Sequence, residues 1–214
     1  MSAFDKHQMS TFRFVRCALD AQTGVATLVY AFDQGPELVE TIAVPGAPFA
    51  LDGADATAVQ QALRLLHLIA GVSYFKAAVP PNIAIDSYSI DAETAALVES
   101  VYLHGLGEFA YRNRLHLHGK IHFPVAAQAS AAAPALGLRE HALVAIGGGK
   151  DSLVSIEALR QLGVEQTVSW IGGSQLIRAC AERTGLPVLN IDRVLAPELF
   201  ELNRQGAWNG HIPV

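Results

Sequence analysis

The chain has 214 residues, of which 51% are hydrophobic and 16% are charged, and its formal net charge is -5 at pH 7. This composition is typical of a globular protein and excludes a largely disordered chain, while the acidic balance argues against a general nucleic-acid binder. The sequence has no apolar run long enough to cross a membrane, and its two cysteines, Cys17 and Cys180, are too few for a disulfide framework. We therefore expect a cytoplasmic protein without membrane insertion.

The first third of the chain predicts an antiparallel meander followed by helices. Residues 11–19, 25–32 and 38–44 are rich in β-branched and aromatic side chains, and turn residues separate them. Asp55 is the expected cap of a helix that ends near Gly71 and carries an apolar stripe made of Val59, Leu63, Leu66 and Ile69. Asp91 is the expected cap of a second helix, whose stripe is made of Leu97, Val98, Val101, Tyr102 and Phe109.

The segment YRNRLHLHGKIHF, residues 111–123, has a period of two and predicts an extended strand. One face of that strand would be basic, and it would consist of Arg112, Arg114, His116, His118, Lys120 and His122. Such a face could bind an anionic substrate or could simply be solvated. A zinc site made of three of its histidines is disfavoured, because the neighbouring cations would repel the metal.

The pattern changes after a weakly periodic stretch at residues 126–138. Strands at 142–146, 167–171 and 188–191 then alternate with helices at 152–162 and 174–184, which predicts a parallel sheet covered on both faces. We thus predict an α/β chain with an N-terminal α+β domain at 1–125 and a linker at 126–139. A parallel βαβ domain, apparently incomplete, would follow at 140–214.

The stretch AIGGGKDS, residues 145–152, lies between the first strand of that βαβ unit and its helix. Free N–H groups and the positive end of the helix dipole meet at this position and favour an anion such as phosphate. A Walker loop is excluded, because Asp151 follows Lys150 and Val144 stands where its first glycine belongs. The dinucleotide fingerprint also fails, since Ser152 takes the place of its third glycine.

The loop does resemble that of the PP-loop ATP pyrophosphatases, whose pattern is Ser-Gly-Gly-x-Asp-Ser. Gly148, Gly149, Asp151 and Ser152 match this pattern, Lys150 takes its variable position, and Gly147 replaces its first serine. The resemblance implies that these six residues hold the pyrophosphate of ATP. It also implies that Gly172 and Gly173, after the second strand, lie by the adenine. The alternative interpretation is a tight strand-to-helix turn with no ligand.

The whole chain resembles the UDP-N-acetylmuramoyl-L-alanyl-L-glutamate epimerases of peptidoglycan synthesis. Three stretches carry this resemblance: AGVSYFKAAVP at 70–80, AIGGGKDS at 145–152 and WNGHIPV at 208–214. It implies an enzyme that uses ATP and magnesium to convert the terminal L-glutamate of UDP-MurNAc-L-Ala-L-Glu to D-glutamate, with release of AMP and pyrophosphate. Because chains of that family continue well beyond this length, we expect a partial chain.

The resemblance also extends to individual residues. It implies substrate contacts for Tyr74 and Lys76, and the diphosphate of UDP or the glutamate carboxylates as ligands of the basic face. Asp151 is a candidate for binding magnesium or for orienting the loop. Asp192 ends a strand at the carboxyl edge of the sheet and is therefore a candidate for magnesium or ribose. Asn209 and His211 receive no role, His67 is expected to be packed or on the surface rather than catalytic, and the base that removes the α-proton is not identified.

Two other functions fit the same loop. A different PP-loop enzyme, such as an amide-forming ligase or a thiolation enzyme, would need ammonia, sulfur or tRNA as its acceptor. The lack of a Cys-x-x-Cys pair and of a basic surplus argues against the tRNA version. A non-catalytic nucleotide-binding module would bind ATP without releasing AMP.

Overall fold

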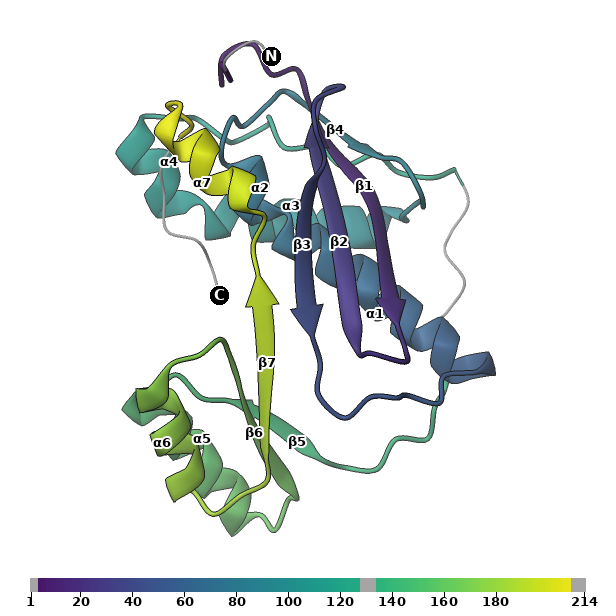
Figure 1. Cartoon of the computed structure of the whole chain (residues 1–214), viewed down its shortest axis with the longest axis vertical. Helices are drawn as coiled ribbons and strands as arrows, with labels where there is room; N and C mark the ends of the chain where they lie inside the picture. The colour runs from purple at the N-terminus through teal and green to yellow at the C-terminus, as the bar shows by residue number, and fades with distance from the viewer. Residues whose placement is uncertain (1–3, 128–133, 209–214) are drawn as a thin grey trace.

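The computed structural model describes residues 4–127 and 134–208 of the chain. Seven strands form one mixed sheet in the order β4-β1-β2-β3-β7-β6-β5 (Figure 1). In chain order the strands are β1 (Thr11–Asp20), β2 (Val25–Phe32), β3 (Leu38–Ala43), β4 (Asn82–Ile85), β5 (Ala142–Ala145), β6 (Gln166–Ile171) and β7 (Val188–Val194). The order places the N-terminal strands at one end of the sheet and the parallel strands β5 to β7 at the other.

The predicted meander is confirmed. Antiparallel pairing joins β1 to β2 and β2 to β3, and the parallel strand β4, which the sequence did not indicate, extends the sheet beside β1. Gly24 makes the first turn with a φ of +74°, and an added Cβ would lie 2.4 Å from the Val44 carbonyl oxygen. This turn therefore needs glycine both for its backbone conformation and for space.

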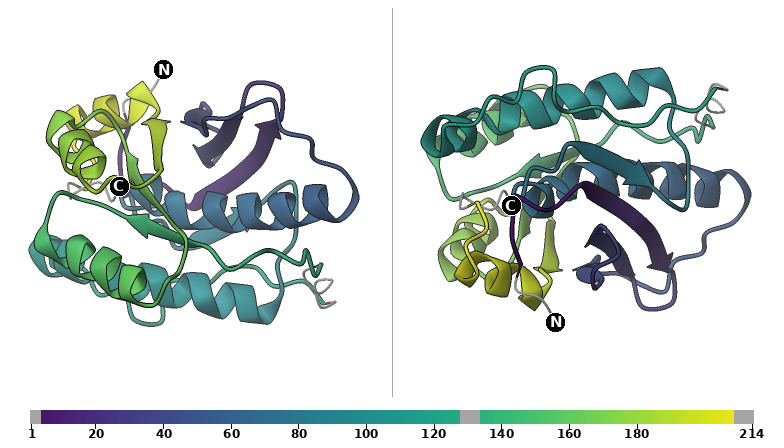
Figure 2. Two further views of the ribbon diagram at one scale, coloured as in Figure 1. Left: turned by 90° about the horizontal axis from the view of Figure 1, so that it is seen from below. Right: turned by 90° about the horizontal axis from the view of Figure 1, so that it is seen from above.

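The helices of the N-terminal part pack on one face of the meander. They are α1 (Gly53–Ala70), α2 (Val72–Phe75), α3 (Ala92–Gly105) and α4 (Gly107–Asn113). Figure 2 shows α1 lying between the β1–β3 sheet and α3. The expected cap of the second helix is confirmed, because the Asp91 side chain accepts a hydrogen bond from the Thr94 amide at 2.8 Å.

The predicted stripe of α1 is partly wrong. The helix begins at Gly53 after Asp52, so Asp55 lies in its first turn and does not cap it. Its buried side chains are Leu63, His67 and Leu68, whereas Leu66 and Ile69 are exposed. Leu97 of the second predicted stripe is exposed as well. An apolar pattern fixes the buried face only approximately, and the neighbouring sheet and helix decide which residues face inwards.

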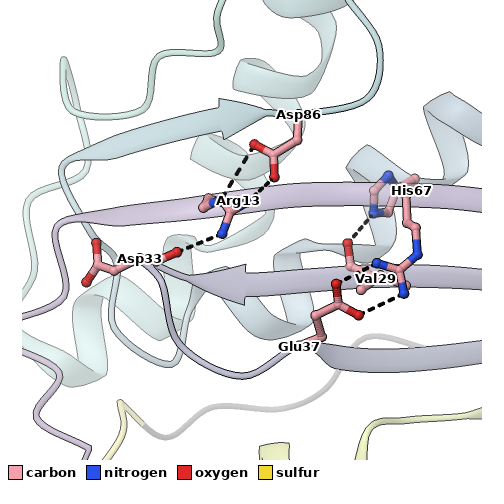
Figure 3. Close-up of polar contacts among 7 residues, drawn as sticks. Arg13, Val29, Asp33, Glu37, His67 and Asp86 are labelled. Carbon is pink, nitrogen blue, oxygen red and sulfur yellow. Dashed lines mark hydrogen bonds and ion pairs between the residues drawn. The ribbon is translucent and has the colours of Figure 1, made fainter.

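His67 is fully buried, as expected for a packed histidine, and Figure 3 shows its contact with Val29. Its Nε2 lies 3.1 Å from the Val29 carbonyl oxygen, so this nitrogen carries the proton, and its Nδ1 lies 3.0 Å from the Tyr88 hydroxyl. Burial lowers the pKa of His67 to about 4. Figure 3 also shows Arg13 held between Asp86 and the Asp33 carbonyl oxygen. These contacts fix the strands and their turns.

The strand predicted at residues 111–123 is wrong. Helix α4 continues to Asn113 and ends at Arg114, which has a φ of +55°, and the chain from Leu115 to Phe123 forms no strand. Leu117, Ile121 and Phe123 are nevertheless buried, as the pattern indicated. The alternation of buried and exposed residues in this segment has another cause: the segment is irregular, and its apolar side chains are packed into the core. Period two alone does not supply the neighbouring strand that a ladder requires.

Strands and helices alternate after residue 140 as predicted, with α5 (Lys150–Gln161) between β5 and β6 and α6 (Gln175–Arg183) between β6 and β7. All three strands are parallel. The expected cover on both faces is wrong, however. Ile156 of α5 and Ala181 of α6 belong to one cluster with Val144 and Val168, so both helices cover the same face. On the other face Leu143 is 59% exposed.

Strand β7 connects the two parts of the molecule. It pairs in parallel with β6 and, further along, antiparallel with β3, as Figure 1 shows. Helix α7 (Pro197–Arg204) follows, and its Leu199 is buried in the N-terminal core. The division into domains at 1–125 and 140–214 remains a prediction, and residues 128–133 of the expected linker lie outside the described residues. Among the described helices none is long and apolar enough to span a membrane.

Candidate functional site

The glycine loop has the position that the sequence predicted. It leaves β5 at Ile146, whose amide donates to the Ser169 carbonyl oxygen at 2.8 Å, and it enters α5 at Lys150. Gly148 has a φ of +80°, which explains a glycine at that position. Gly149 precedes the helix in an extended conformation and, lacking a side chain, leaves the first N–H groups of α5 without a side-chain cap.

Packing does not explain the other two glycines of the loop. A Cβ added to Gly147 or Gly149 would meet no atom within 4 Å, and neither residue has a positive φ. The space beside the loop is therefore open. Bare backbone facing open space at the positive end of a helix is the arrangement that lets an anion approach N–H groups closely.

The charged side chains of the loop are on the surface. Lys150 and Asp151 are exposed, and Ser152 is half-buried, with its hydroxyl donating to the Gly149 carbonyl oxygen at 3.1 Å. The serine thus ties the helix start back to the loop. Lys150 remains on the surface as a positive charge next to the uncapped N–H groups.

The carboxyl edge of the parallel strands brings the other predicted nucleotide residues to the same side of the sheet. Gly172 follows β6 with a φ of +88°, and its amide donates to the Ile191 carbonyl oxygen at 2.9 Å. The side-chain amide of Asn190 donates to the Gly172 carbonyl oxygen at 3.0 Å. Sequence reasoning missed this anchor, although an asparagine inside the apolar strand was a signal. Gly173 comes next, and Asp192 lies exposed on β7.

The magnesium roles of Asp151 and Asp192 remain predictions. Both carboxylates are exposed, and Asp151 lies in the first turn of α5. The expectation that Asp192 ends its strand is wrong, because β7 continues to Val194 and pairs there with β3. In residues 4–127 and 134–208, no group of three or more histidine, cysteine or acidic side chains could hold a metal ion by itself.

The predicted basic face does not form, because its residues are not on a strand. Arg112 lies on α4 and pairs with Glu108 at 2.9 Å, and Arg114 ends that helix. His116 and His118 are exposed on the irregular segment that follows, as are Lys120 and His122. Their contacts with a substrate stay predictions and gain no support from a shared face.

Tyr74 and Lys76 lie in a buried polar cluster at the junction of β3, β7 and α2, which we call the seam cluster and which also contains Glu40, Ser73 and Arg193. The Arg193 Nε donates to the Glu40 carboxylate at 2.6 Å, with side-chain exposures of 10% and 0%. A second guanidinium nitrogen lies 3.3 Å from the Ser73 hydroxyl, and the Tyr74 hydroxyl accepts from the Ala196 amide at 3.0 Å. The cluster therefore joins three elements by polar contacts.

Charges in the seam cluster act on its titratable groups. Burial, helped by the positive charge of Arg193, lowers the pKa of Lys76 to about 8. Burial and the Glu40 carboxylate raise the pKa of Tyr74. Sequence reasoning did not find Glu40 and Arg193, although a glutamate at a core-facing position of LVETIA was the available signal. The substrate roles of Tyr74 and Lys76 stay predictions, and both side chains are buried.

Two of the stretches that carry the sequence resemblance meet beside the seam cluster. The amide of Trp208, which begins WNGHIPV, donates to the carbonyl oxygen of Ala77 in AGVSYFKAAVP at 2.8 Å. Asn209 and His211 lie outside the described residues. Segments more than 100 residues apart in the chain thus adjoin one another next to the carboxyl end of β7.

A separate cavity of about 940 Å³ lies between α1 and the start of α3. Its lining includes Gln60, Arg64 and Asp91 but none of the predicted site residues. The glycine loop and the seam cluster are thus not part of this cavity.

Comparison with known proteins gives a consistent family. The model of the MurL N-terminal domain matches residues 3–214. A UDP-N-acetyl-alpha-D-muramoyl-L-alanyl-L-glutamate epimerase of Xanthomonas oryzae pv. oryzae is 93% identical over 214 residues, which is 100% of this chain and 48% of the relative. Epimerases with the same name from a Micromonospora strain and from Salinispora tropica are each 38% identical over 97% of this chain.

The chain spans about half the length of these curated relatives, with 47% of the Micromonospora protein and 46% of the Salinispora protein aligned. No solved structure matches the chain significantly. The sequence relatives, and not a structural neighbour, therefore establish the family.

Proposed function

The chain belongs to the MurL N-terminal domain family, and from this premise we propose that it forms the amino-terminal part of an ATP-dependent epimerase. Its substrate would be UDP-MurNAc-L-Ala-L-Glu, whose terminal L-glutamate would become D-glutamate. The names of the three relatives support the substrate and the reaction. We expect the reaction in the cytoplasm, where ATP is available.

The observation that carries the ATP role is the uncapped start of α5 behind three exposed glycines. We propose that the N–H groups of Gly147 to Ser152 hold the phosphates of ATP and that Lys150 adds a positive charge. Gly172 and Gly173, at the end of the neighbouring strand, would leave room for the adenine. Asp151 or Asp192 would help to hold magnesium, which would offset the negative charge of the phosphates.

The chemistry explains why an epimerase would need ATP. Removal of the α-proton of glutamate places negative charge beside a carboxylate and is therefore unfavourable. If a carboxylate oxygen attacks the α-phosphorus of ATP and pyrophosphate leaves, the resulting acyl adenylate has lost that negative charge. A base can then take the α-proton, and an acid can return a proton to the opposite face. Water finally cleaves the mixed anhydride and releases AMP, so one ATP and one water are consumed for each inversion.

Nucleotide product analysis tests this function. The 214-residue chain and the full-length Xanthomonas oryzae relative are incubated separately with ATP, magnesium and the UDP-linked dipeptide. We expect AMP and D-glutamate to rise in equal amounts with the relative. ADP as the product would contradict adenylation, and AMP that forms only with added ammonia would identify an amide-forming ligase.

Equilibrium ATP binding tests the loop by itself. Lys150→Ala and Ser152→Ala are each expected to weaken ATP binding by about tenfold, the size of one charged contact or less. Arg183→Ala, at an exposed cation outside the loop, is the matched control and should bind ATP normally. Unchanged affinity in both loop variants would contradict the loop assignment, and ATP binding without AMP release in the full-length protein would favour a nucleotide-binding module.

A further inference from the structure

One edge of the parallel strands and the adjoining part of one face are uncovered in the described structure. Strand β5 pairs with β6 on one side and is the last strand of the described sheet on the other. Figure 1 shows its outer side facing away from β6 and β7. Parallel sheets are normally buried on both faces, and an apolar edge strand left open invites another chain to pair with it.

The exposure of the uncovered face increases toward the β5 edge. Side chains that alternate with the helix-covered Val144 and Val168 belong to this face. Next to the N-terminal core Ile191 is partly buried, and on β6 Ser169 is buried while Ile171 is 37% exposed. On β5 Leu143 is 59% exposed. The face is thus closed at β7 by the chain itself and open at β5.

The backbone of β5 is open at the same residues. The amides of Ala142 and Ile146 donate toward β6, to the carbonyl oxygens of Glu165 and Ser169. Because N–H groups alternate sides along a strand, those of Leu143 and Ala145 point to the free edge. Their side chains lie on the open face, so one partner could cover both the edge and the face.

We propose that a β-strand from the other half of the full-length relatives adds in parallel beside β5, and that its connecting helix covers the face around Leu143. The aligned region occupies 48% of the Xanthomonas oryzae relative, so a similar length of chain is available there as the occupant. A helix that crosses over on the second face is the usual partner of a parallel strand added at this side. The glycine loop would then lie at the point where the strand order reverses, the position at which open α/β sheets bind ligands.

Residue-resolved hydrogen exchange tests the proposal without any assay of activity. The amides of Leu143 and Ala145 are expected to exchange about 100-fold more slowly in the full-length Xanthomonas oryzae relative than in the 214-residue chain. The amides that align with Ala142 and Ile146 should be protected in both proteins and serve as the internal control. Equal exchange at the two edge amides in the two proteins would overturn the proposal. Protection that rises with the concentration of the 214-residue chain would also overturn it, in favour of a second copy.

A pair of substitutions gives an independent test. Leu143→Lys is expected to reduce the soluble yield of the full-length relative several-fold and to leave that of the 214-residue chain unchanged. Leu162→Lys, at an exposed leucine after α5, is the matched control and should affect neither protein. An equal effect of Leu143→Lys on both proteins would contradict a partner that only the longer chain supplies. Because neither experiment involves ATP or the dipeptide, failure here and failure of the proposed function remain distinguishable.

Discussion

The N-terminal part of the molecule and the β5–β7 unit differ in how completely their apolar side chains are buried. The first encloses an aromatic core in which Phe12, Phe14, Tyr30 and Tyr102 are fully buried. The second has only a small apolar cluster between its strands and two helices, and part of its other face is open. The open unit carries the glycine loop. The comparison indicates that the closed part supplies the frame from which the proposed nucleotide-binding edge extends.

Truncation of a core side chain in each part is expected to change the free energy of unfolding more than any other substitution considered. Equal losses in the two parts would contradict the difference in closure between them. Phe12→Ala should reduce the free energy of unfolding by about 4 kcal/mol, because the aromatic neighbours cannot close the cavity. Ile156→Ala should cost only about 2 kcal/mol, since the smaller cluster can collapse. Guanidinium unfolding followed by circular dichroism measures both values. Phe200→Ala, at a half-exposed position, is the control.

The connection between the two parts is the next expected weak point. Arg193→Met should reduce the free energy of unfolding by about 3 kcal/mol, because it leaves the Glu40 carboxylate buried without its ion pair. The double variant Glu40→Met with Arg193→Met should recover most of that loss, which a double-mutant cycle measures. Arg204→Met removes an exposed pair with Glu201 and should change the stability by less than about 0.5 kcal/mol. Additive effects at the two seam positions would contradict the coupling.

The smallest of these effects is expected to be a pH dependence of folding stability, which originates from His67 in the N-terminal part. His67 stays neutral in the folded protein down to its pKa of about 4, whereas an unfolded histidine takes up a proton near 6.5. The unfolded state therefore binds more protons between these values, and stability is lost as the pH falls from 6.5 to 4. We expect this residue to contribute about 2 kcal/mol to that loss.

Urea unfolding at pH 7 and pH 4.5 measures this dependence. His67→Gln should flatten it, because the substitution removes the group that titrates. If the His67→Gln variant lost as much free energy of unfolding between pH 7 and pH 4.5 as the wild type, other groups would be the cause of the acid sensitivity.

Local sequence signals were sufficient for much of the architecture. Turn residues between β-rich segments predicted the meander, Asp91 predicted the start of α3, and the alternating segments after residue 140 predicted β5 to β7 with their helices. The glycine loop was placed correctly because a strand end, three glycines and a helix start follow one another directly in the chain. Each of these features depends on neighbouring residues and so can be seen in the sequence.

The tertiary structure decided what depends on partners distant in the chain. Residues 111–123 have the period of a strand, but no strand lies beside them among the described residues, and they pack instead as an irregular segment. The pairing of Glu40 with Arg193 joins positions that are 153 residues apart, so no local pattern could indicate it. The open face at Leu143 also escaped prediction, because an apolar strand has the same sequence whether or not a second layer covers it. Sequence periodicity thus determined which side chains alternate between two faces, and the arrangement of the strands determined which other residues those side chains contact.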